Sequence, residues 1–197
     1  MNPSSEFLAA LELIEMLLFS PRTGVLIGLL TVAAVSDVRT GRIPNWLVFG
    51  GALYALAYNA FYPVYPRDIG ILFALGGLSV GLVAFLPGYL LRVLGAGDVK
   101  LMAMVGSFVG TWAAVEAVLA SLITGGALAV ALSLYFGRLP LMLQNVVALF
   151  RGNVLTLATA PAGLTVEGGR SAGRMPYGVA IALGTIGYLV LEQLGMI

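Results

Sequence analysis

Two aspartates occupy positions where a carboxylate is costly, and they are the residues of this sequence best suited to chemistry. Asp37 stands at the end of one strongly apolar stretch, and Asp98 stands at the start of another. Acidic residues in such stretches are functional-site candidates by default. Two carboxylates that share a site supply an acid and a base, because their mutual repulsion keeps one of them protonated. Such a pair can activate water and protonate a carbonyl oxygen, which predicts amide hydrolysis without a covalent intermediate.

The composition excludes most other catalytic chemistries. The chain has no histidine, the commonest general base and metal ligand, and no cysteine to act as a nucleophile or to bind zinc. We therefore expect no metal site and no cofactor. The net charge of +1 gives no electrostatic reason to expect nucleic acid as a partner.

Each aspartate also fits a structural role. Asp98 follows a Gly-Ala-Gly sequence at 95–97 and precedes an apolar stretch, so it fits an ordinary helix N-cap. Asp37 ends a helix, where the helix dipole disfavours a carboxylate, but an ion pair with Arg39 or Arg42 would stabilise it. The two glycines support the functional interpretation, since they let the backbone leave helical geometry and let another chain approach closely.

The elements that must position these aspartates are membrane helices. Hydrophobic residues make up 60% of the chain and charged residues only 10%, with a mean hydropathy of +1.01. A soluble domain carries roughly 25% charged residues. The surface of this protein must therefore meet lipid, and we predict an all-α, polytopic membrane protein.

Six apolar stretches are long enough, or nearly so, to cross the bilayer as helices of ~20 residues. They lie near residues 23–38, 46–62, 69–91, 98–112, 114–136 and 177–195. Two further stretches, 7–19 and 139–150, are predicted to be interfacial amphipathic helices, within an N-terminal segment 1–22 and a segment 137–176 that ends in a glycine-rich loop over 151–176. Because no repeat or linker is visible, we expect residues 1–197 to form a single membrane-embedded domain with six transmembrane helices in one bundle.

The basic residues predict the orientation of this bundle. With six spans, one face holds eight of the ten Lys and Arg residues: Arg39, Arg42, Arg92, Lys100, Arg138, Arg151, Arg170 and Arg174. Basic loops stay in the cytoplasm, so this face is cytoplasmic and both termini lie outside. The two aspartates then lie at the same depth, near the cytoplasmic boundary of the inner (plasma) membrane.

Around the aspartates the sequence resembles the type IV prepilin peptidases, aspartic membrane peptidases with a G-x-G-D motif. A lone G-x-G-D is a weak signal, but an aspartate followed by I-P-N after the first span, combined with G-A-G-D-V-K after the third, is specific. The resemblance covers residues from about 24 to 195. The matching segments are Asp37 with Ile43-Pro44-Asn45, Gly95-Ala96-Gly97-Asp98-Val99-Lys100, and Pro176-Tyr177-Gly178.

The resemblance implies an endopeptidase that cleaves the leader peptide of prepilin-like substrates at the cytoplasmic membrane boundary, with the prepilin and membrane lipids as its partners. Asp37 and Asp98 match the catalytic pair. Simpler roles stay open for some neighbours, because Lys100 fits a snorkelling side chain and Pro44 and Pro176 fit helix starts. The residues implied to shape the site or bind substrate are Gly95, Gly97, Lys100, Pro44, Asn45, Pro176, Tyr177 and Gly178.

The chain departs from the long members of that family, because it has no cysteines and no insert between the predicted N-terminal interfacial helix and the first span. It is similar to the short form found in tight-adherence (Flp-type) pilus systems or to the preflagellin peptidases, which implies that it lacks N-methyltransferase activity. The alternative from another class is a small proton- or cation-coupled transporter that uses the two aspartates. Transporter acids tend to lie near the midplane between repeated halves, and the sequence shows no such repeat.

Overall fold

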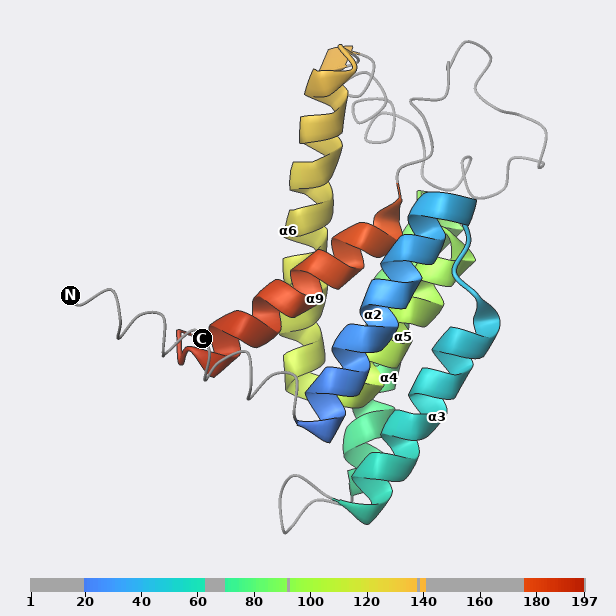
Figure 1. Cartoon of the computed structure of the whole chain (residues 1–197), viewed down its shortest axis with the longest axis vertical. Helices are drawn as coiled ribbons and strands as arrows, with labels where there is room; N and C mark the ends of the chain where they lie inside the picture. Colours follow the sequence, from blue (N-terminus) through green and yellow to red (C-terminus); the bar gives the residue numbers. More distant parts are fainter. Residues whose placement is uncertain (1–19, 63–69, 92, 138, 141–175, 197) are drawn as a thin grey trace.

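The computed structural model describes residues 20–62, 70–91, 93–137, 139–140 and 176–196. These contain six named helices and no strand, which confirms the all-α prediction (Figure 1). The predicted and observed bounds agree within about three residues. The helices are α2 (Pro21–Thr40), α3 (Asn45–Phe61), α4 (Gly70–Leu90), α5 (Ala96–Val109), α6 (Thr111–Tyr135) and α9 (Tyr177–Gln193). The interfacial helices predicted at 7–19 and 139–150 and the loop at 151–176 lie outside the described residues, apart from 139–140 and 176.

Proline and glycine set the bounds of α2 and so fix where the chain turns after Asp37. Pro21 occupies the first turn, where its fixed φ suits a helix start. Gly41 ends the helix in the left-handed conformation with φ 61°, and its amide donates a 2.8 Å hydrogen bond to the carbonyl of Asp37. Because α3 begins only four residues later, the end of α2 and the start of α3 lie at the same end of the bundle (Figure 1).

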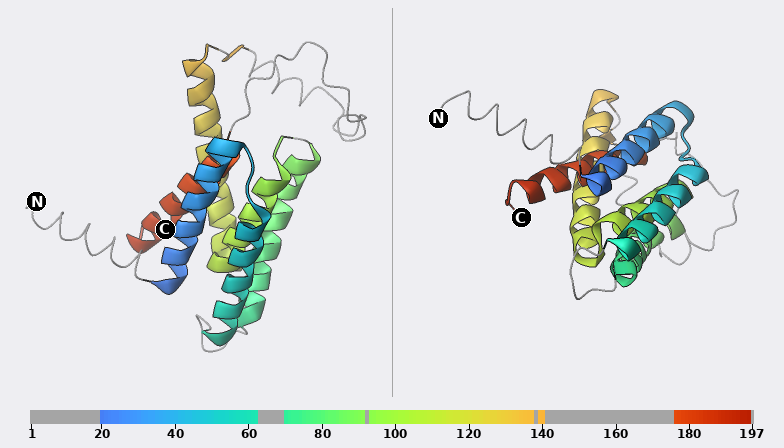
Figure 2. Two further views of the ribbon diagram at one scale, coloured as in Figure 1. Left: turned by 45° about the vertical axis from the view of Figure 1, so that its right-hand side comes forward. Right: turned by 60° about the horizontal axis from the view of Figure 1, so that its bottom comes forward.

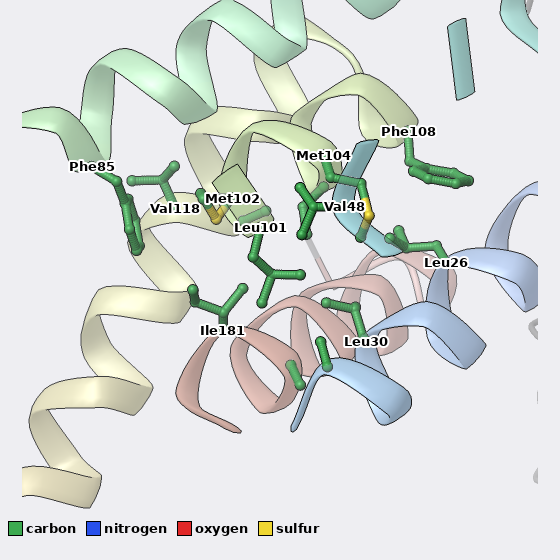
Figure 3. Packing of buried hydrophobic residues seen from close by; sticks show 14 of the residues in the cluster. Leu26, Leu30, Val48, Phe85, Leu101, Met102, Met104, Phe108, Val118 and Ile181 are labelled. Carbon is green, nitrogen blue, oxygen red and sulfur yellow. The ribbon is translucent and has the colours of Figure 1, made fainter. Parts of the chain in front are cut away.

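Helix α5 is the central element of the bundle. It packs against α2, α3, α4, α6 and α9, and its residues 101–108 are all buried. Figure 3 shows Leu101 and Met102 of α5 among side chains of the surrounding helices, including Ile181 of α9 and Val118 of α6. Figure 2 shows that α9 crosses α6 obliquely, whereas α3 and α4 run alongside α5. The start of α5, with Asp98, is therefore held from several sides.

The backbones of α4 and α5 touch at a pair of glycines. A Cβ atom added to Gly77 would overlap the carbonyl oxygen of Gly106, and one added to Gly106 would overlap the carbonyl oxygen of Gly77. Small residues at such crossings allow membrane helices to approach closely. The contact fixes the position of α5 against α4.

Three of the helices, α2, α4 and α6, are long and apolar enough to cross a membrane, and α9 is a shorter apolar helix. Large apolar side chains such as Val32, Val83 and Ile123 are exposed on their outer faces, as expected for surfaces that meet lipid. The protein is therefore a membrane protein, and the count of six spans stays a prediction. With 14 residues, α5 measures only ~21 Å, which is shorter than the ~30 Å hydrocarbon core.

Candidate active site

One cavity of about 920 Å³ brings the two aspartates together. It lies where α2 ends and where α3, α5 and α9 begin, and part of α6 forms another wall. Pro44, Pro176 and Gly178 do not line it, although Gly178 contacts one of the aspartates. The predicted site residues that line it are Asp37, Asn45, Gly95, Gly97, Asp98, Lys100 and Tyr177.

Asp37 lies in the last turn of α2 and is held by the first turn of α9. Its Oδ2 atom accepts a 2.7 Å hydrogen bond from the backbone amide of Gly178, and the residue is only 9% exposed. The first amides of a helix have no partner within the helix, so they are available to such a carboxylate. The ion pair considered for Asp37 with Arg39 or Arg42 is not formed between these described residues, whose arginine side chains are exposed.

Asp98 is the third residue of α5, and the cap of that helix is Gly95. The interpretation of Asp98 as the N-cap is therefore wrong. Its Oδ2 atom instead reaches back and accepts a 2.9 Å hydrogen bond from the Gly95 amide, as an acid at the third helical position does in a capping box. Asp98 is also 9% exposed, so the two aspartates are similarly buried. Each of their carboxylates accepts a hydrogen bond from a backbone amide.

The glycines beside Asp98 provide space rather than an unusual backbone conformation. Gly95 has φ −79° and ψ 154°, an extended conformation open to any residue, so the expected conformational role is wrong there. A Cβ added to Gly95 would lie 3.2 Å from Oδ2 of Asp98, and one added to Gly97 would lie 3.3 Å from Cβ of Ile43. At Gly97 the close approach is made by the loop between α2 and α3.

Lys100 joins the start of α5 to the start of α3. Its Nζ atom donates a 3.0 Å hydrogen bond to Oδ1 of Asn45 and lies 5.4 Å from the ring centroid of Phe49. The side chain is therefore anchored within the protein rather than only snorkelling. Arg42 lines the same cavity, so two cations lie near the two carboxylates. Pro44 is the N-cap of α3, which fits the helix-start role that had been left open.

Tyr177 connects the cavity to α4 and α6. Its ring packs edge-on against Phe85 at 6.0 Å, and a Cβ added to Gly125 of α6 would lie 2.7 Å from the tyrosine hydroxyl oxygen. Pro176 is the N-cap of α9, as its helix-start role predicts. The packing of Tyr177 thus fixes the start of α9, and with it the Gly178 amide that binds Asp37.

Sequence reasoning missed the α6 wall of the cavity. The wall residues carry no titratable group and belong to no motif. Which face of a mostly apolar helix turns toward a cavity is set by its neighbours, not by its own sequence. The residues of this α6 wall are Leu122, Gly126 and Ala129, and the adjacent Gly125 also lines the cavity.

A second cavity of about 1070 Å³ opens at the opposite end of the bundle, between the start of α2 and the end of α9. Its lining includes Arg22, Glu116, Tyr188 and Glu192 but neither aspartate. We place the candidate active site in the smaller cavity because only that one holds both carboxylates. Among the described residues, no group of three or more His, Cys, Asp or Glu side chains is arranged to hold a metal ion.

Comparison with known proteins gives one match. The profile of the type IV leader peptidase family matches residues 24–130, more than half of the 197-residue chain. The matched region runs from α2 into α6 and includes both aspartates, whereas α9 lies outside it. No curated protein and no solved structure gives a significant match.

Proposed function

The chain belongs to the type IV leader peptidase family, and from that premise we propose that it is an aspartic endopeptidase whose catalytic pair is Asp37 and Asp98. Membership makes the protein a membrane peptidase with prepilin-like substrates. The observation that supports an aspartic mechanism is that two buried carboxylates, 61 residues apart in sequence and on different helices, line one cavity.

The chemistry of this pair is general acid–base hydrolysis. One carboxylate accepts a proton from water as the water oxygen attacks the scissile carbonyl carbon, and the other, protonated, gives its proton to the carbonyl oxygen. Collapse of the tetrahedral intermediate breaks the C–N bond, and the leaving amine takes up a proton. The backbone amides of Gly178 and Gly95 hold the two carboxylates in place, which keeps them oriented toward the substrate.

The proposed substrate is a prepilin-like protein of the type IV or Flp class. Cleavage removes its leader peptide at the cytoplasmic boundary of the inner membrane, and the enzyme does not methylate the new amino terminus. The absence of cysteines supports the last point, because the resemblance links methyl transfer to long members with a cysteine-bearing insert. The cations Arg39, Arg42 and Lys100 at the cavity end of the bundle support a cytoplasmic active site.

The test is to incubate the purified protein in detergent with candidate prepilins and to determine product masses. We expect two fragments whose masses sum to those of the substrate and one water, with no added methyl group. Asp37→Asn and Asp98→Asn should each abolish cleavage while leaving the protein folded, because Asn retains the oxygen that accepts the amide hydrogen bond. Substantial turnover by either variant would contradict the proposed pair.

A further inference from the structure

We propose that the substrate's apolar helix, next to the scissile bond, docks against a wall of the cavity formed by Leu122, Gly126 and Ala129 of α6. The inference rests on the proposed function, because it takes the cavity with Asp37 and Asp98 as the active site. It goes further by assigning one side of that cavity to one part of the substrate.

The three residues of this α6 wall form one continuous surface. They are spaced at i, i+4 and i+7, so they lie on one face of the helix, and all three line the cavity. The neighbouring position on that face, Gly125, is already covered by the Tyr177 ring. Leu122, Gly126 and Ala129 are therefore the part of this face left for a ligand in the cavity.

The α6 wall lies at the level of the aspartates. Ser121 of α6 lies beside Met102 of α5, with Oγ and Sδ 4.0 Å apart. Asp98 lies one helical turn from Met102, and because α6 runs antiparallel to α5, Gly125 and Gly126 lie one turn from Ser121 in the same direction. A peptide bond placed between the carboxylates would thus have Gly126 beside it.

Gly126 is not explained by the packing of the protein itself. A Cβ added there would meet no described atom within 4 Å, whereas one at Gly125 would strike Tyr177. Three other helical glycines have equally open surroundings: Gly28, Gly50 and Gly187. Of these four, only Gly126 lines the cavity that contains the aspartates.

The two sides of the cavity differ in polarity, which determines the part of the substrate that fits each. Arg42, Asn45 and Lys100 offer hydrogen-bonding groups on one side, whereas the α6 wall offers only apolar and small surface. A substrate segment within the bilayer must be helical, because helical structure satisfies its backbone polar groups. Helices pack closely over Gly and Ala, so the α6 wall fits the apolar helix and the opposite side fits the polar, non-helical chain at the cleavage site.

Disulfide trapping tests this placement directly, because the chain has no cysteine of its own. Gly126→Cys is combined with Asp98→Asn to prevent cleavage and is mixed with prepilins that carry single cysteines along the first turns of the apolar helix. We expect disulfides at substrate positions that recur every three to four residues, and none for matched Gly50→Cys or Gly187→Cys. Equal cross-linking of all three variants, no cross-linking, or a disulfide-linked dimer of the Gly126→Cys chain would each overturn the proposal.

A larger side chain at Gly126 tests the same proposal by kinetics. Gly126→Leu enters open space and improves helix propensity, so its melting temperature should equal that of the control Gly50→Leu. We expect KM for a full-length prepilin to rise at least about tenfold for Gly126→Leu, the equivalent of ~1.4 kcal/mol, with no change for Gly50→Leu. Unchanged KM in Gly126→Leu would overturn the docking surface but leave the proposed peptidase intact, whereas failure of the unmodified chain to cleave any prepilin would contradict the proposed function itself.

Discussion

At the scale of single residues, the candidate site depends on how two backbone amides hold two carboxylates. Asp37 and Asp98 each accept one such hydrogen bond through Oδ2, from Gly178 and Gly95 respectively. The donors differ in origin, because Gly95 is three residues from its acid and Gly178 is 141 residues away. The hydrogen bond to Asp98 is therefore local to the start of α5, whereas the one to Asp37 depends on how α9 packs against α2.

This difference makes Gly178 a sensitive position. In Gly178→Ala the new Cβ would lie 2.8 Å from Oδ2 of Asp37, which displaces the carboxylate. We expect the rate of prepilin cleavage to fall by about 100-fold, as for catalytic groups moved by ~1 Å. Single-turnover kinetics with a prepilin measure this rate. The matched control is Gly187→Ala on the same helix, where the methyl group enters open space. Equal activities of the two variants would contradict a role for the Gly178 contact.

The chemistry of the side chains also predicts the response to chelators. The chain has no His and no Cys, and the two carboxylates already have backbone partners. We therefore expect the rate of prepilin cleavage to be unchanged in EDTA and in added Zn²⁺ or Mg²⁺, because water activation is assigned to a carboxylate. A loss of activity in EDTA that a divalent metal restores would contradict the aspartic mechanism.

At the scale of elements, α5 is the helix on which the site depends. It is short, buried on nearly all sides and in contact with all five other named helices of the described chain. Its start carries Asp98 and Lys100, and the Lys100–Asn45 hydrogen bond joins it to α3. A shift of α5 would therefore move Asp98 relative to Asp37, which belongs to α2.

The glycine contact between α4 and α5 provides a test of this dependence. In Gly77→Ala the methyl group would overlap the backbone of α5 at Gly106, so the helices must separate. We expect the free energy of unfolding to fall by about 1–3 kcal/mol, as for an overpacked core, and the cleavage rate to fall with it. Thermal melts in detergent measure the first effect. Gly28→Ala on the exposed face of α2 is the control, and a Gly77→Ala melt no lower than that of the control would contradict the helix contact.

At the scale of the whole molecule, the sequence predicts the helices far better than their mutual packing. Each apolar run has its own local limits, such as Pro21 before α2 and Gly41 after it, and these limits suffice to place the elements. Contacts between distant segments have no such local signal. The hydrogen bond from Gly178 to Asp37 joins α9 to α2, and only the family resemblance pointed to both ends of it.

The α6 wall is a second feature that the sequence does not predict. Apolar or small residues occupy nearly every position of α6 around Gly126, so hydropathy alone does not indicate that Gly126 turns toward a cavity and Ile123 toward the outside. The position of Asp98 at the start of α5 was equally hard to predict from the sequence. An acid near a helix start fits either the cap or the third helical position, and the structure selects the second because Gly95 takes the cap.

The orientation of the molecule in the membrane is the remaining prediction at this scale. Arg39, Arg42 and Lys100 lie at the cavity end of the bundle, and basic residues favour the cytoplasmic side. Exposed positions at the two ends, Thr40 after Asp37 and Tyr62 at the far end of α3, report on orientation as single cysteines. In intact cells, a membrane-impermeant maleimide should label Tyr62→Cys but label Thr40→Cys only after permeabilisation. Because the chain has no other cysteine, the reverse pattern would place both carboxylates outside the cell, away from newly made prepilin, and would contradict cytoplasmic cleavage.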